Sequence, residues 1–168
     1  MIKLNLKNIL LNFFVVLIIF LIDRFSKIYI LKMAELNDMI NIYINSYLNI
    51  YLIWNEGIAF GLLAFKHNII YNLVSFLIIC IIFAITIMLI KAKGLKKHAL
   101  ISVLGGAIGN LFDRIYYKAV PDFIDLHIGN FHWFIFNVAD IFITIGIICL
   151  IYDEIFYNKA CIKNENSI

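Results

Sequence analysis

Four long apolar stretches constrain this chain more than any other feature of its sequence. They cover about residues 9–31, 68–90, 98–114 and 133–152, each near the roughly 20 residues that cross a bilayer as a helix. Of all residues, 64% are hydrophobic and 15% are charged, with a mean hydropathy of +0.95. A soluble domain of this size cannot bury so much apolar surface. We therefore expect one α-helical integral membrane domain, residues 1–168, with four transmembrane helices.

The lysines predict how these helices are oriented. Lys3 and Lys7 precede the first stretch, which resembles a signal peptide but is followed by Asp23 and Arg24 rather than by a cleavage site. The link between the second and third stretches is the most basic; it contains Lys91, Lys93, Lys96 and Lys97. By the positive-inside rule, both termini and this link are cytoplasmic, and residues 32–67 and 115–132 face outward.

The first outward segment has the pattern of a β-hairpin rather than of a plain linker. Residues 40–45 and 48–52 alternate apolar and polar side chains, and Asn45-Ser46 between them suits a turn. We expect an outer β segment over about residues 38–61, amphipathic enough to lie against the membrane surface.

Polar groups from three of the apolar stretches are expected at one level. Counting 1.5 Å of rise per residue places Asp23, Asn110 and Asp140 each about 10–12 Å below the outer face. Asp140 carries the most weight, because a buried carboxylate with no basic neighbour in its own helix usually marks function. Asn137, three residues before it, is expected on the same helix face.

Simpler roles remain open for several of these groups. Asp23 and Lys27 can form just an ion pair within one helix, and Arg114 can extend to lipid phosphate. The run Gly105–Gly109 can serve close helix packing alone. Asn137 can serve only to form a hydrogen bond between helices. Acids in a loop, such as Asp122 and Asp125, are most often solvated.

Other chemistries have no support in the sequence. The cysteines have no metal-ligand spacing, the histidines are scattered without a zinc pattern, and no serine has a nucleophile-elbow signature. A net charge of only +3 gives no reason to expect nucleic acid as a partner. We expect no cofactor and no metal.

Five motifs in order resemble the bacterial lipoprotein signal peptidases, or signal peptidase II. They are Asp23 with Lys27, the block from Asn55-Glu56-Gly57 to Gly61, Gly105 to Arg114 (GGAIGNLFDR), Val120-Pro121-Asp122-Phe123, and Phe136-Asn137-Val138-Ala139-Asp140. Each is weak alone, but together they are specific and extend from residue 23 to 140. Pro121 departs mildly from the family, in which an aliphatic residue is commoner.

The resemblance implies an aspartic endopeptidase of the bacterial cytoplasmic membrane, with four helices and an extracytoplasmic β-cradle. It implies that diacylglyceryl-modified prolipoproteins are cut just before the lipidated cysteine, near the outer face and among membrane lipids. Asp122 and Asp140 match the catalytic pair. The positions implied to shape the site and bind substrate are Asp23, Lys27, Asn55, Gly57, Asn110, Arg114 and Asn137.

Two nearby carboxylates suit amide hydrolysis, because their mutual repulsion keeps one of them protonated. We expect the outer segment to fold back and bring the carboxyls of Asp122 and Asp140 within about 3–6 Å of each other. The alternative is a small proton- or ion-coupled transporter that uses Asp23 and Asp140 as relays. A transporter predicts polar groups through the whole membrane depth, whereas the inner halves of the stretches carry almost none apart from Asn12 and Ser102.

Overall fold

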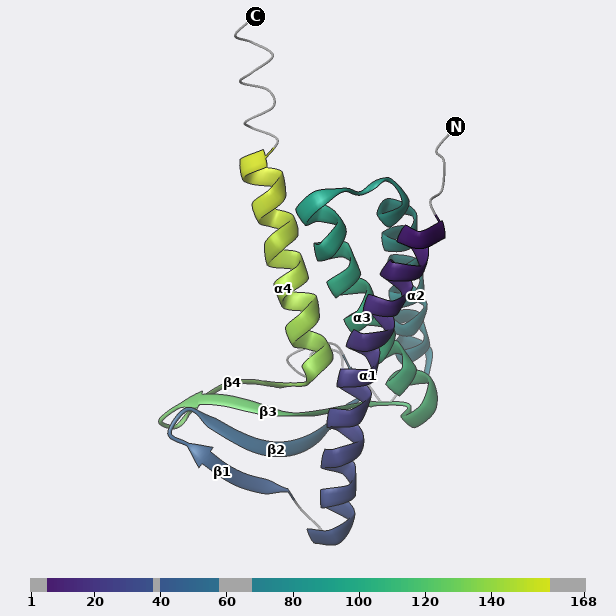
Figure 1. Ribbon diagram of the computed structural model, residues 1–168. Helices are drawn as coiled ribbons and strands as arrows, with labels where there is room; N and C mark the ends of the chain where they lie inside the picture. Colours follow the sequence, from purple (N-terminus) through teal and green to yellow (C-terminus); the bar gives the residue numbers. More distant parts are fainter. Residues whose placement is uncertain (1–5, 38–39, 58–67, 158–168) are drawn as a thin grey trace, which may run out of the picture.

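The fold is a helical bundle with an antiparallel sheet at one end (Figure 1). The computed structural model describes residues 6–37, 40–57 and 68–157. Its elements, in chain order, are α1 (Leu6–Asn37), β1 (Asn41–Asn45), β2 (Leu48–Asn55), α2 (Asn68–Lys91), α3 (Gly94–Tyr117), β3 (Val120–Ile128), β4 (Phe131–Phe136), α4 (Val138–Tyr152) and a π-helical turn (Asp153–Tyr157). The expected block from Asn55 to Gly61 is therefore described only as far as Gly57.

Two helices, α1 and α2, are long and apolar enough to cross a membrane. On α2, large apolar side chains such as Leu73, Phe76 and Phe83 are about two-thirds exposed, which is the surface that hydrocarbon would cover. The first stretch was expected to end near residue 31, but α1 has 32 residues and is about 48 Å long. It therefore exceeds a hydrocarbon core of about 30 Å, and Figure 1 shows its C-terminal half running down beside the sheet.

The centre of the bundle is α3, which packs against α1, α2 and α4. Close packing requires its glycines. A Cβ on Gly106 would lie 2.5 Å from the backbone oxygen of Ala139, and one on Gly105 would lie 2.7 Å from Ile19. The packing role predicted for this glycine run is thus confirmed at both positions.

The predicted hairpin exists and forms half of a larger sheet. Strand β1 pairs with β2, with Asn45 opposite Leu48, and the Asn45 side chain accepts a hydrogen bond of 2.8 Å from the Tyr47 amide in the turn. The strand order is β1-β2-β3-β4, antiparallel throughout. The residues of the expected outer loop 115–132 instead complete α3, form β3 and begin β4.

The prediction that the fourth apolar stretch is one continuous helix from residue 133 is wrong. Residues 131–136 are the edge strand β4, and the helix begins only at Val138. A continuous apolar run has no periodicity that distinguishes a strand from a helix, and the aromatic side chains of this one favour a strand. The boundary is set by Asn137, which caps α4.

The connections alternate between the two ends of the bundle. The start of α1, the α2–α3 link and the end of α4 lie at the end away from the sheet (Figure 1). The sheet and the ends of α3 and α4 that join it lie at the other. Residues contributed by α1, α3 and both hairpins can therefore meet where the bundle joins the sheet.

Candidate active site

Asp122 lies in β3 with only 2% of its surface exposed. Its Oδ1 accepts a hydrogen bond of 2.6 Å from the side-chain amide of Asn137, and its Oδ2 accepts one of 3.0 Å from that of Asn55. Burial, and then the charge of Asp140, raise the pKa of Asp122 from 3.8 to about 6. Asp122 is thus a buried strand residue held by two neutral donors, not a solvated loop acid.

Asp140 lies in the first turn of α4 and takes part in a capping box with Asn137. The Asn137 side chain accepts from the Asp140 amide at 3.2 Å, and the Asn137 amide donates to Asp140 Oδ2 at 3.1 Å. Asn110 of α3 donates to Asp140 Oδ1 at 2.8 Å. The depth calculated for Asp140 from residue 133 is therefore wrong, because no helix precedes Asn137, but the hydrogen bond from Asn110 agrees with the expectation that the two residues lie at one level.

Asn137 joins the two carboxylates, through its side chain to Asp122 and through its backbone to Asp140. It is completely buried. The expectation that it shares a helix face with Asp140 was wrong: Asn137 is the cap, in extended conformation, immediately before the helix. This position lets one residue bond to a strand on one side and to a helix on the other.

A buried cluster of charged side chains around Lys27 lies next to the carboxylate pair of Asp122 and Asp140. The Lys27 ammonium donates to Asp23 at 2.8 Å, to Asn110 Oδ1 at 2.9 Å and to Asp113 at 2.6 Å. Arg24 forms a second ion pair with Asp113. The pairing of Asp23 with Lys27 is therefore only part of a network that links α1 to α3.

Asp23 also connects α1 to α4, because its other oxygen accepts a 3.0 Å hydrogen bond from the amide of Ala139. Such an amide, in the first turn of a helix, has no partner within the helix. Gly109 makes room for this contact, since a Cβ there would lie 2.7 Å from the Asp23 carboxylate. Arg24 and Asp113 were not predicted as members of the cluster, although Arg24 adjoins Asp23 and Asp113 lies within the motif Gly105 to Arg114.

Arg114 lies near Asn55 rather than on the carboxylate pair. Its guanidinium donates to the carbonyl of Gly57, whose amide in turn donates to Asn55 Oδ1 at 3.0 Å. Only 6% of Arg114 is exposed, and its Nε and Nη1 atoms have no hydrogen-bond partner among the described residues. A guanidinium buried in this way is not extended to the bilayer surface, and no acid among the described residues pairs with it.

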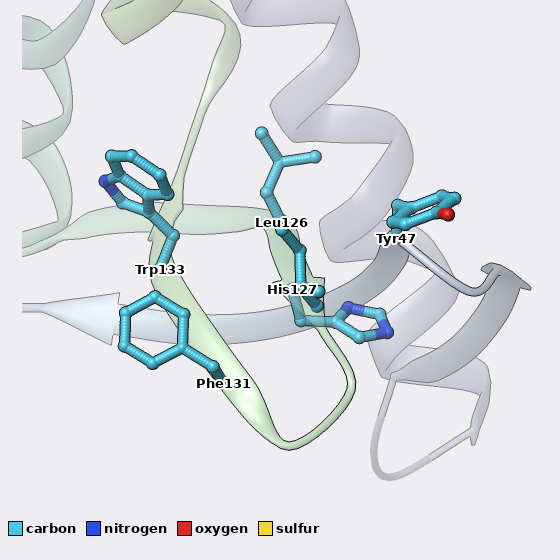
Figure 2. A pocket seen from close by; sticks show the side chains of 6 residues that line it. Tyr47, Leu126, His127, Phe131 and Trp133 are labelled. Carbon is cyan, nitrogen blue, oxygen red and sulfur yellow. The ribbon is translucent and has the colours of Figure 1, made fainter.

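Asp125 also differs from the expected solvated acid, because it is buried and hydrogen-bonded. Only 3% of it is exposed, and both of its oxygens lie within 3.0 Å of His132 Nδ1 on β4. Beside it, at the tip of the β3–β4 hairpin, is an apolar cavity of about 230 Å³. Its lining residues are Tyr47, Leu126, His127, Ile128, Phe131 and Trp133 (Figure 2). This cavity is separate from the carboxylate pair.

Known proteins resemble the chain over all the elements that form this site. The family model "Signal peptidase (SPase) II" matches residues 15–156. The lipoprotein signal peptidase of Pelagibacter ubique (strain HTCC1062) is 51% identical over 164 residues, which are 98% of this chain and 99% of that protein. That of Anaplasma phagocytophilum (strain HZ) is 39% identical over 140 residues, 82% of this chain and 87% of that one. A bacterial membrane enzyme solved by the in meso method matches with a TM-score of 0.71 and 29% identity, covering 86% of this chain and 89% of its own.

Proposed function

This chain belongs to the signal peptidase II family of aspartic peptidases, and we propose that Asp122 and Asp140 are the carboxylates with which it cleaves prolipoproteins. Lipoprotein signal peptidase activity is the activity of this family, and the chain is a bacterial membrane enzyme. The observation that carries the assignment of the two aspartates is the double role of Asn137, which hydrogen-bonds to both.

In the proposed mechanism the pair holds a single proton. The ionised carboxylate removes a proton from a water molecule, the water attacks the scissile carbonyl carbon, and the protonated carboxyl donates to the leaving nitrogen. The pKa of about 6 for Asp122 supports such sharing. It is close enough to neutrality for the residue to gain and lose a proton under working conditions.

The donors around the pair favour this chemistry. Each carboxylate accepts from two amide groups, which fix its orientation without adding a positive charge. An arginine or lysine in direct contact would hold a carboxylate in its ionised form. Lys27 is one residue removed, because it bonds to Asn110 and Asn110 bonds to Asp140.

The substrate we propose is a prolipoprotein whose cysteine already carries diacylglycerol, cut on the N-terminal side of that cysteine. The apolar outer surfaces of the helices suit a substrate held by acyl chains. Near the pair, the guanidinium of Arg114 donates to the carbonyl of Gly57, which supports a role for both in positioning the segment around Asn55 that would meet the peptide backbone of the substrate. Asp23, Lys27 and Asn110 are better suited to support the site than to touch substrate, because Asp23 and Lys27 are wholly buried.

The decisive experiment incubates purified protein, in lipid, with a diacylglyceryl-modified prolipoprotein. Asp122→Asn and Asp140→Asn should each abolish cleavage, and the double variant should be no worse than either, because the two residues act as one unit. Asp153→Asn, at the far end of α4, is the matched control and should remain active. Substantial turnover by either single variant would overturn the assignment.

We also propose four transmembrane helices with both termini cytoplasmic and the carboxylate pair near the outer face. The lysine-rich α2–α3 link and the sheet lie at opposite ends of the bundle, which supports this orientation (Figure 1). Reporter fusions after Lys97 and after Tyr47 should therefore report opposite sides of the membrane. Reports from the same side would contradict the four-span topology.

A transporter is the weaker hypothesis. The carboxylates it would use as relays are already hydrogen-bonded within the protein: Asp23 to Lys27 and the amide of Ala139, Asp140 to Asn110 and Asn137. These contacts lie where the bundle joins the sheet, whereas the inner halves of the helices carry few polar side chains, among them Asn12 and Ser102, whose hydroxyl donates to the carbonyl of Phe142.

A further inference from the structure

Three potential metal ligands meet on the β3–β4 hairpin, outside the carboxylate pair. They are Asp125 and His127 of β3 and His132 of β4, and their ligand atoms all lie within 4.8 Å of one another. We expected no metal site, because the histidines are scattered in the sequence without a zinc pattern. They converge because His127 pairs directly with His132 across the hairpin, and because Asp125 and His127 are two apart on one face of β3.

From this arrangement we propose that the hairpin binds one divalent transition-metal ion of the zinc class, through Asp125, His127 and His132. Two imidazoles and one carboxylate form a ligand set typical of zinc sites that keep a position open. The proposal does not depend on the peptidase function.

The distances suit one ion. Ligand atoms about 2.1 Å from a tetrahedral zinc lie roughly 3.4 Å from one another. His132 Nδ1 is 2.9 Å from Asp125 Oδ2, and His127 Nδ1 is 3.8 Å from the same oxygen. Side-chain rotations that bring these ligand atoms, which all lie within 4.8 Å of one another, to that spacing would place them around one centre.

The unpaired nitrogen of His127 is the independent sign of a missing partner. The His127 side chain is only 9% exposed, yet its Nδ1 forms no hydrogen bond among the described residues. A buried polar atom without a partner is costly, and native structures rarely keep one. A metal ion between His127, Asp125 and His132 would supply that partner.

Charge and access favour a cation here. Asp125 is buried with 4% of its side chain exposed and brings a negative charge, and His132, at 55% exposed, leaves the site open to solvent. A water molecule can therefore fill the fourth position. Figure 2 shows the His127 ring between Tyr47 and the aromatic side chains of β4, so that apolar groups cover the other side.

Such an ion would join β3 to β4 next to the catalytic region. Asp122 lies on β3 three residues before Asp125, and β4 leads directly into Asn137. Backbone bonding of His127 to Tyr47 adds the β1–β2 turn to the same unit. The site would thus stiffen the hairpin that holds both partners of the Asp122–Asn137 hydrogen bond.

The test is metal binding by the full-length protein, purified through a tag without histidine and stripped with a chelator. We expect one Zn²⁺ per chain by calorimetric titration. Co²⁺ should give the visible absorption of a tetrahedral site, without the sulfur charge-transfer band that a cysteine site would show. His127→Gln, His132→Gln and Asp125→Asn should each weaken Zn²⁺ binding at least about tenfold.

His98→Gln is the matched control, because His98 is an exposed histidine at the far end of α3. It should leave Zn²⁺ affinity unchanged. His132→Gln is the safest of the ligand variants to fold, since the side chain is half exposed. No stoichiometric Zn²⁺ binding by the unaltered protein, or equal affinity in His132→Gln and His98→Gln, would overturn the proposal.

Discussion

Replacing Lys27 by methionine tests whether the buried ion cluster holds the bundle together. Methionine has nearly the length of lysine but no charge, so the change removes three hydrogen bonds with little change in volume. These are the bonds to Asp23, Asn110 and Asp113. The carboxylates of Asp23 and Asp113 are completely buried, and among the described residues only Arg24, which pairs with Asp113, would remain to balance them.

The expected loss is large because the remaining charges would be stranded. Removing one partner of a buried ion pair costs about 3–5 kcal/mol. Lys32→Met is the matched control: Lys32 lies on the same helix but is exposed, and such a change is usually within about 0.5 kcal/mol. The Lys27→Met/Asp113→Asn double variant should recover part of the loss, because it removes one of the stranded charges.

The free energy of unfolding can be measured in mixed micelles by titration with a denaturing detergent. Trp54 is a convenient reporter, since its ring packs 5.4 Å from that of Tyr117 and so joins β2 to the end of α3. A loss below about 1 kcal/mol for Lys27→Met, or one no larger than that of Lys32→Met, would refute the reasoning about stranded charge.

Two further predictions concern pH and Arg114. Since the folded pKa of Asp122 is about 6 and its ordinary value 3.8, the folded protein keeps this proton to higher pH than the unfolded chain does. The stability contributed by the protonated form is thus complete below about pH 4 and is lost as pH rises through 6. At about 1.4 kcal/mol per pH unit, the loss in free energy of unfolding is about 3 kcal/mol. In unfolding titrations from pH 4 to 8, Asp122→Asn should abolish this loss. Arg114→Lys keeps the charge but loses the planar fork that bonds to Gly57, so kcat/KM in the cleavage assay should fall by about tenfold or more, and undiminished cleavage would refute a positioning role for Arg114.

The sequence predicted those parts of the fold whose patterns are unambiguous. The alternation in residues 40–52 identified the first hairpin. Polar groups within apolar runs placed Asp23, Asn110 and Asp140 at one level, which agrees with their contacts: Lys27 bonds to both Asp23 and Asn110, and Asn110 bonds to Asp140. Counting the helix rise per residue was a valid way to place the polar groups of α1 and α3, because both segments are helical from end to end.

The second hairpin could not be found in this way. In β4 the sequence Phe131-His132-Trp133-Phe134-Ile135-Phe136 is almost entirely apolar and continues into the apolar α4. Neither a period of 2 nor one of 3.6 can be read from it. The same failure concealed the pairing of Asp125 with His132, because without the strand there is no register to bring them together.

That register also explains how residues 18 positions apart in the sequence come to share one site. Ile124 pairs with Phe136 across the hairpin, so extending the antiparallel register by two residues sets Asp122 opposite Val138, the first residue of α4. Asn137 then reaches across to Asp122 with its side chain, while its backbone holds Asp140 one helical turn further on. An insertion of one residue in the Gly129–Asn130 turn that shifted this register would turn the side chains of β4 to the opposite face and move Asn137 away from Asp122, because β3 is also held by its pairing with β2. The hairpin, and not the depth of any helix in the membrane, is what brings Asp122 to Asp140.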